Sequence, residues 1–229
     1  MESFALFSYE ITNKGILNMK TKIFNLIILD ESGSMCCIKK EAINSVNETV
    51  QTISSAEREN ENQEHFVSLV TFNDKVKMVY DCVPVGEVKE LTSETYCPGR
   101  CTALYDAMGI SLNALCLKTS EDDRILVTVV TDGCENASRE YDAKAIKVLV
   151  DELKGKGWVF AYIGANQDVE QNAAIISITN TMTYQSTSEE TERMVKRVNR
   201  SRERFYARLS SRCFDSIMEN EHFFDDKGE

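Results

Sequence analysis

Two kinds of hydrophobic run alternate along the chain. Residues 23–29 and 125–131 are continuous apolar runs, which are typical of strands buried on both faces of a parallel sheet. Residues 38–56 instead carry apolar side chains three and four positions apart, which predicts an amphipathic helix. Strands that alternate with helices predict an α/β domain. Its sheet should be mostly parallel and doubly wound, with helices on both faces.

The remaining elements follow from the same criteria. Further helices are predicted at 104–115, 143–153, 169–176 and 189–209, and further strands at 158–163 and 182–184. Two short runs, 66–72 and 76–79, are separated by Asn73-Asp74-Lys75, a turn signal that predicts an antiparallel pair with a strand at the sheet edge. We expect His65 to begin this edge strand, after a polar helix end and loop at 57–64.

The chain of 229 residues is long enough for one domain of this kind. We expect the domain to span 21–212. Residues 1–20 would form an N-terminal extension, and residues 213–229 an acidic C-terminal tail that is frayed.

Composition narrows the classes of function. The formal net charge of −11 argues against nucleic acid and anionic membranes as partners. The start of the chain does not resemble a secretion signal, and the apolar run at 23–29 is too short to cross a membrane. The eight cysteines have no regular spacing, so a cytoplasmic protein with reduced thiols is the expectation. The oligomeric state stays open.

Polar residues gather where the predicted strands end. Asp30, Ser32 and Ser34 follow the first core strand, and Asp132 follows the strand at 125–131. Thr102 opens a helix, where we expect it to be the N-cap. In parallel sheets the carboxyl ends of the strands meet at one edge. Hydroxyls with two carboxylates suit a hard cation such as Mg²⁺, whereas zinc favours His and Cys.

With these residues the sequence resembles the von Willebrand factor type A (vWA) domain family from about Lys22 to Leu209, which implies a Rossmann-like fold. The motif of that family is the metal-ion-dependent adhesion site, written Asp-x-Ser-x-Ser, then Thr, then Asp. The chain carries it complete and in order as Asp30, Ser32, Ser34, Thr102 and Asp132. The segments 102–107 and 131–136 look like those of bacterial members.

The resemblance implies a role in binding. Ser32, Ser34 and Thr102 would contact Mg²⁺ or Mn²⁺ directly, and Asp30 and Asp132 would act through water or through hydrogen bonds to these ligands. One coordination position would stay open for a Glu or Asp carboxylate of a partner protein. The chain would then be a protein-binding module and not an enzyme.

Two other classes remain as alternatives. A magnesium-dependent hydrolase or phosphotransfer enzyme would use Asp30 as its nucleophile, but position 32 is not acidic and no lysine closely follows the other core strands. The only histidines, His65 and His222, leave a Ser-His-Asp triad poorly supported. The other alternative is a scaffold whose metal is merely structural.

Several neighbouring residues have two interpretations. Glu31 occupies a free position of the motif and is expected to face solvent. Asp106 either supports the metal site or simply suits the first turn of its helix, and we favour the helix. Residues 165–168 form either part of a partner surface or a turn.

Five of the cysteines lie near the site segments in sequence: Cys36, Cys37, Cys97, Cys101 and Cys134. The simplest interpretation is that cysteine is a small, adaptable residue. A redox-sensitive rim, with oxidation joining Cys97 to Cys101, and a second site for a soft metal are the alternatives.

The last predicted helix carries an arginine stripe at Arg193, Arg197, Arg200, Arg204 and Arg208. These side chains share one face. The simplest interpretation is a solvated face. The alternatives are docking of an acidic partner or of the acidic tail, which includes Glu219, Glu221, Asp225 and Asp226, and, as a weaker one, nucleic acid.

Overall fold

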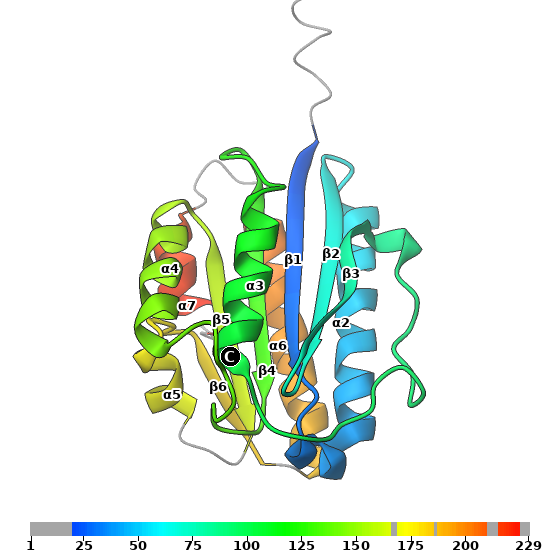
Figure 1. The fold of residues 1–229 in the computed structure, drawn as a ribbon. Coiled ribbons are helices and arrows are strands. Elements are labelled where there is room, and N and C mark those ends of the chain that lie inside the picture. Colours follow the sequence, from blue (N-terminus) through cyan, green and yellow to red (C-terminus); the bar gives the residue numbers. More distant parts are fainter. Residues whose placement is uncertain (1–19, 166–168, 186, 210–214, 225–229) are drawn as a thin grey trace, which may run out of the picture.

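The structure is a computed structural model, and it describes residues 20–165, 169–185, 187–209 and 215–224 (Figure 1). Its sheet contains β1 (Thr21–Asp30), β2 (Gln63–Phe72), β3 (Val76–Pro84), β4 (Arg124–Thr131), β5 (Val159–Ala165) and β6 (Thr181–Tyr184). The strand order is β3-β2-β1-β4-β5-β6. All neighbours are parallel except β2 and β3, so the predicted sheet with an antiparallel edge strand is confirmed.

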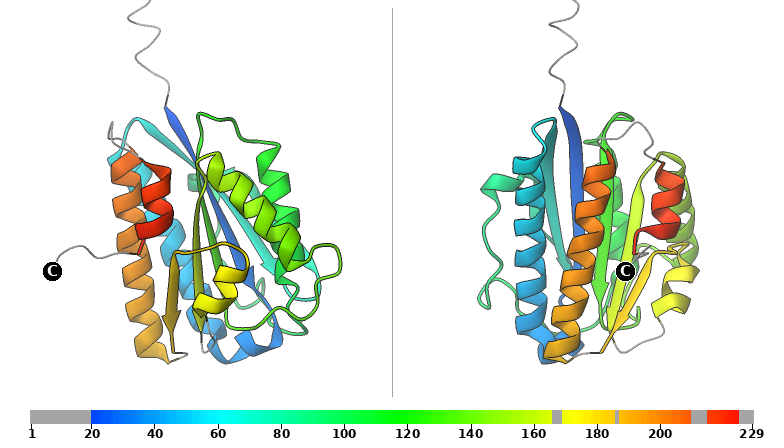
Figure 2. Two further views of the ribbon diagram at one scale, coloured as in Figure 1. Left: turned by 90° about the vertical axis from the view of Figure 1, so that its left-hand side faces the viewer. Right: turned by 180° about the vertical axis from the view of Figure 1, so that it is seen from behind.

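Helices cover both faces of the sheet (Figure 2). On one face lie α2 (Lys39–Glu59), α6 (Ser188–Leu209) and α7 (Ser216–His222), and on the other lie α3 (Leu104–Cys116), α4 (Ala143–Gly155) and α5 (Val169–Ile175). Two short 3-10 helices, η1 (Gly33–Ile38) and η2 (Val85–Glu87), were not predicted. In the described part of the chain, no helix combines the length and the apolar character needed to cross a membrane.

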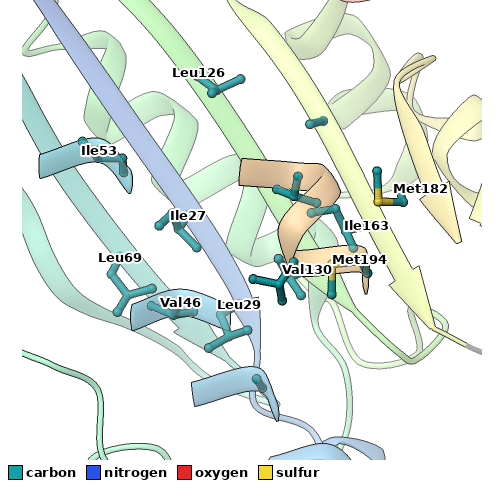
Figure 3. Close-up of a cluster of buried hydrophobic side chains, with 14 of the residues drawn as sticks. Ile27, Leu29, Val46, Ile53, Leu69, Leu126, Val130, Ile163, Met182 and Met194 are labelled. Atoms are coloured by element: carbon teal, nitrogen blue, oxygen red, sulfur yellow. The ribbon is translucent and has the colours of Figure 1, made fainter. Parts of the chain in front are cut away.

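The central strand β1 divides the core into two halves. Successive side chains of a strand point to opposite faces. Accordingly Ile27 and Leu29 belong to the half under α2 and α6, as Figure 3 shows, whereas Leu26 and Ile28 belong to the half under α3 and α4. This burial on both faces explains why β1 reads as a continuous apolar run.

A buried polar network interrupts the half of the core under α6. It comprises Asn25, Gln63, His65, Thr128, Arg202 and Tyr206. The Tyr206 hydroxyl donates to Asn25 Oδ1 at 2.5 Å, and Gln63 Nε2 donates to the Tyr206 carbonyl at 2.8 Å. Arg202 is 1% exposed, and its Nη2 donates to Thr128 Oγ1 at 2.8 Å. The network fixes α6 on β1, β2 and β4.

The network also corrects two sequence predictions. Gln63 and Glu64 belong to β2 and not to a loop, because Gln63 is buried and hydrogen-bonded to α6. His65 does not begin an edge strand: β2 lies between β1 and β3, and β3 is the edge. The His65 ring is fully buried and its Nε2 lies 3.0 Å from Gln63 Oε1.

The chain after residue 215 is not frayed over its described length. Helix α7 leads into Phe223 and Phe224, which are 0% and 5% exposed and join the core. The side chain of Asn220 accepts a hydrogen bond from Phe160 N at 3.0 Å and donates to the Trp158 carbonyl at 2.7 Å. This segment therefore completes the sheet face beside β5.

Part of the arginine stripe holds this C-terminal segment. Arg208 pairs with Glu219 at 2.6 Å, and Arg197 donates to the Phe224 carbonyl at 3.2 Å. Arg193 instead pairs with the adjacent Glu189 and Glu190. The docking alternative thus holds for Glu219, whereas the exposed Glu221 lies beside His222, at 3.8 Å, and Asp225 and Asp226 lie outside the described residues.

Candidate metal centre

Asp30 is the last residue of β1 and is completely buried. Its Oδ1 accepts a hydrogen bond from Ser32 N at 2.7 Å, and its Oδ2 accepts one from Thr131 Oγ1 at 2.6 Å. The Tyr96 hydroxyl donates to its carbonyl at 2.5 Å. Both carboxylate oxygens are therefore fixed, so Asp30 holds the Ser32 loop against the end of β4.

The two serines of the loop connect Asp30 to Asp132. Ser32 Oγ lies 3.1 Å from Ser34 Oγ, and Ser34 Oγ donates to Asp132 Oδ1 at 2.5 Å. Ser32 is buried, Asp132 is half-buried and Ser34 is exposed. The row of oxygens thus runs from the protein interior to the surface.

Thr102 is held by main-chain contacts that leave its hydroxyl available. Its N donates to Asn136 Oδ1 at 2.9 Å, and its carbonyl accepts from Asn136 N and Ala137 N. The expectation that Thr102 is an N-cap is wrong, because Ala103 occupies that position, and the side chains of Glu135 and Ser138 accept from N–H groups in the first turn of α3. Within the described residues, Thr102 Oγ1 makes no hydrogen bond.

Gly133 shows that these oxygens surround one space. A Cβ built on Gly133 would lie 3.1 Å from Thr102 Oγ1, 3.5 Å from Ser34 Oγ and 3.7 Å from Asp30 Oδ2. Two of these oxygens come from the loop at 30–34 and the third from Thr102, far away in the sequence, and they converge on a spot that any side chain at 133 would occupy. We call Asp30, Ser32, Ser34, Thr102 and Asp132 the oxygen cluster.

The oxygen cluster concentrates negative charge in a partly desolvated place. Burial raises the pKa of Asp30 to about 6, against the hydrogen bonds from Thr131 and Ser32, and the charge of Asp132 raises it further. Burial also raises the pKa of Asp132. A nearby cation would favour the charged form of both carboxylates. Hydroxyl and carboxylate oxygens around one space fit Mg²⁺ or Mn²⁺.

Glu31 does not face solvent. It is 8% exposed, and its Oε1 accepts a hydrogen bond from Cys97 N at 2.6 Å. The Glu31 carbonyl also accepts from Gly99 N. The prediction was wrong because the side chain turns inward to hold the 97–100 loop beside the oxygen cluster.

Two further acids organise the loop between β4 and α4. Glu135 accepts hydrogen bonds from the N–H groups of Tyr105, Ala137 and Ser138. Asp106 accepts from the N–H groups at 139, 140 and 141. Asp106 therefore has a structural role beyond the first turn of α3, because it anchors this loop.

Three supporting residues were missed by sequence reasoning. Thr131 fixes Asp30, Asn136 fixes Thr102, and Tyr96 fixes the carbonyl of Asp30. Only Thr131 had a sequence signal, since it directly precedes Asp132 at a strand end. Of the loop at 165–168, residues 166–168 lie outside the described residues, so its two interpretations stand.

The cysteines do not form a second metal site among the described residues, where no group of three or more His, Cys, Asp or Glu side chains is placed to hold a metal ion. The seven cysteines in these ranges are free thiols. Cys97 Sγ contacts the carbonyls of Ser93 and Glu94.

The fold and the position of the site define the class of the protein. It is a Rossmann-like α/β domain whose polar site lies at the carboxyl ends of the central strands. The sequence pattern of the von Willebrand factor type A domain matches residues 26–199, and the chain belongs to that family. No curated protein sequence matches the chain.

Solved structures share the fold at low sequence identity. Proximal thread matrix protein 1 from the mussel byssus has 14% identity and a TM-score of 0.53, over 82% of this chain and 47% of that one. The ArnB paralog VWA2 from Sulfolobus acidocaldarius has 16% identity and a TM-score of 0.54, over 79% and 45%. The pilus adhesin SpaC from Lactobacillus rhamnosus GG has 13% identity and a TM-score of 0.61, over 82% and 31%.

The matched region covers less than half of each of these three structures. At these identities the likeness concerns the fold alone. Because the similar structures come from several kinds of source, the bacterial placement stays a prediction.

Proposed function

We propose that this chain is a metal-dependent protein-binding module. Ser32, Ser34 and Thr102 would hold Mg²⁺ or Mn²⁺, supported by Asp30 and Asp132. The bound cation would offer a position for a Glu or Asp carboxylate of a partner protein. A cytoplasmic location remains an expectation from the sequence.

The convergence of oxygens around Gly133 carries this proposal. The loop at 30–34 and Thr102 supply them, and the Thr102 hydroxyl, which no cap uses, lies within this convergence. In a chain of net charge −11, the two carboxylates would repel an acidic partner unless a dication offset them. The fold relatives named as a pilus adhesin and a thread matrix protein agree with a binding role.

The environment of Asp30 supports binding over phosphoryl transfer. A nucleophilic carboxylate must present an oxygen to the substrate. Both Asp30 oxygens accept hydrogen bonds, and the side chain is 0% exposed. Within the described residues, no lysine or histidine forms a hydrogen bond or an ion pair with the oxygen cluster.

Calorimetry with Mg²⁺ and Mn²⁺ tests the metal site. Wild type should bind one cation, and Asp132→Ala should show no binding at concentrations that saturate wild type. Thr102→Val replaces the hydroxyl with a methyl group of similar size and should weaken binding by roughly tenfold. Thr52→Val, a half-buried position in the middle of α2, serves as the matched control. Unchanged binding by Asp132→Ala would refute the metal site.

The binding role requires a second experiment. Immobilised wild type should retain a protein partner in Mg²⁺ and release it in chelator, while Thr102→Val should retain less than Thr52→Val. Acidic residues of that partner should then be replaced singly by their amides, and one replacement should abolish retention. If the partner is retained equally in Mg²⁺, in chelator and by Thr102→Val, the metal has a structural role and the adhesion proposal fails.

A further inference from the structure

A pocket of about 450 Å³ opens at the junction of η1 and α2. Its lining includes Cys36, Cys37, Lys39, Lys40, Glu41 and Ser93. None of these residues belongs to the oxygen cluster. The volume is within the range of pockets that bind small molecules.

The two thiols in this pocket differ in their contacts. Cys36 Sγ donates to the Pro98 carbonyl at 3.4 Å, so its proton is engaged with the protein. Cys37 is exposed, and it makes no hydrogen bond within the described part of the chain. Cys37 is therefore the thiol that can meet an incoming reagent without first breaking a protein contact.

The charges around Cys37 favour an anionic reagent. Lys39 Nζ donates to the Ser93 carbonyl at 2.9 Å, which places its charge at the pocket wall. Lys40 is exposed and forms no ion pair among the described residues. Glu41 offsets one of these charges, and the start of the 21-residue helix α2 adds positive potential. The pocket is thus locally positive on a chain of net charge −11.

We propose that this pocket is a thiol-modification site, at which Cys37 forms a mixed disulfide with an anionic low-molecular-weight thiol. The co-reactant is the disulfide form of that thiol, and glutathione disulfide, whose halves carry carboxylates, is the probe. Lys40 attracts the carboxylates, and the pocket holds the attached group.

The reaction is a thiol–disulfide exchange. Cys37 loses its proton to solvent, and its sulfur attacks one sulfur of the reagent. A bond forms between Cys37 Sγ and that sulfur while the S–S bond of the reagent breaks. The departing thiolate takes up a proton. Cys37 is oxidised, the released half of the reagent is reduced, and no further oxidant is required.

The test treats the full chain with three disulfides of different charge, in the presence of chelator so that the proposed metal plays no part. Glutathione disulfide is anionic, 2-hydroxyethyl disulfide is neutral and cystamine is cationic. Intact mass measures the rate of addition, and peptide fragmentation locates it. The exposed Cys101 and Cys134, which do not line the pocket, are internal controls.

We expect the first glutathione to attach at Cys37, several-fold faster than at Cys101 or Cys134. Lys40→Gln should slow glutathione addition several-fold and leave the neutral reagent unaffected. Cys37→Ser should remove the fast phase. The proposal is overturned if the exposed cysteines react at one rate, if cystamine reacts fastest at Cys37, or if Cys37→Ser keeps the fast phase.

Discussion

The oxygen cluster and the buried polar network belong to the same central strands, but they differ in charge and in access to solvent. The oxygen cluster carries two carboxylates, and its row of oxygens reaches the surface at Ser34. The buried polar network is enclosed under α6, and its only full charge is Arg202. Within the described residues, Arg202 has no carboxylate partner, and its Nε has no hydrogen-bond partner.

The two regions therefore illustrate two roles of polar residues in a mostly apolar core: one can receive a ligand, and the other positions a helix. A negative cluster with an opening can receive a cation from solvent, so its unfavourable charge is relieved by binding. An enclosed positive group cannot be relieved in that way, so it lowers stability while its hydrogen bonds specify where α6 lies. The two regions should therefore respond differently to substitution.

The largest expected effect is the loss of metal binding in Gly133→Ala. The added methyl would lie 3.1 Å from Thr102 Oγ1 and would occupy the space that the oxygen cluster surrounds. We expect cation affinity measured by calorimetry to fall at least about a hundredfold, or about 2.7 kcal/mol.

Gly86→Ala is the matched control, because a Cβ at Gly86 meets nothing within 4 Å. Thermal unfolding in chelator should show that both variants fold. If Gly133→Ala binds the cation as tightly as wild type, the cation does not lie in the space beside Gly133.

Acid should weaken the folded state through the buried polar network. Burial, and to a lesser degree the charge of Arg202, lower the pKa of His65 from 6.5 to about 4. The unfolded chain therefore takes up this proton first as pH falls. The contribution of neutral His65 to the free energy of unfolding is complete above pH 6.5. It is lost progressively toward pH 4, and about 2 kcal/mol is lost at pH 5.

Urea unfolding of wild type and His65→Phe at pH 7.5 and pH 5 measures this contribution. The many carboxylates affect both proteins equally, so the difference between their pH dependences isolates His65. Parallel pH dependences in the two proteins would show that His65 takes up its proton without cost in the folded state.

The smallest expected effect is a gain in stability for Arg202→Met. The variant removes a buried charge and keeps the volume of the side chain, although Thr128 Oγ1 loses its donor. We expect the free energy of unfolding to rise by about 1 kcal/mol. The pH dependence due to His65 should become weaker as well, because a positive neighbour is gone. Strong destabilisation would mean that the hydrogen bonds of Arg202 outweigh the cost of its charge.

The sequence predicted the parts of the molecule that local patterns determine. Continuous apolar runs located β1 and β4, because a strand buried on both faces carries apolar side chains on both faces. Asp30, Ser32, Ser34 and Asp132 were selected because they follow strand ends, and Thr102 because it opens a helix. The structure brings them together, while metal binding itself stays a proposal. The supporting roles of Thr131 and Asn136 were not predicted, because they depend on contacts with residues far away in the sequence.

The sequence did not predict the buried polar network, and the reason is the same. Arg202 lies outside the arginine stripe, four residues after Val198 and three before Phe205, so its spacing places it on the apolar face of α6, but the spacing does not show which polar groups would surround it. Gln63 was predicted to lie in a loop and His65 to begin an edge strand, because nothing near them in the sequence shows that α6 covers them. Burial of polar side chains depends on partners far away in sequence, which a periodic pattern does not contain.

The C-terminal segment has a consequence for how the domain is delimited. The family pattern ends at residue 199, yet Phe223 and Phe224 fill the core and Asn220 satisfies the main chain of β5. A chain that ended at residue 199 would lose about half of α6. It would also lose the C-terminal phenylalanines, so the apolar side chains of the sheet beneath them would be exposed. The unit that can be transplanted, fused or shortened without loss of solubility therefore extends at least to residue 224. The boundary shared with relatives and the boundary required for folding are different places on this chain.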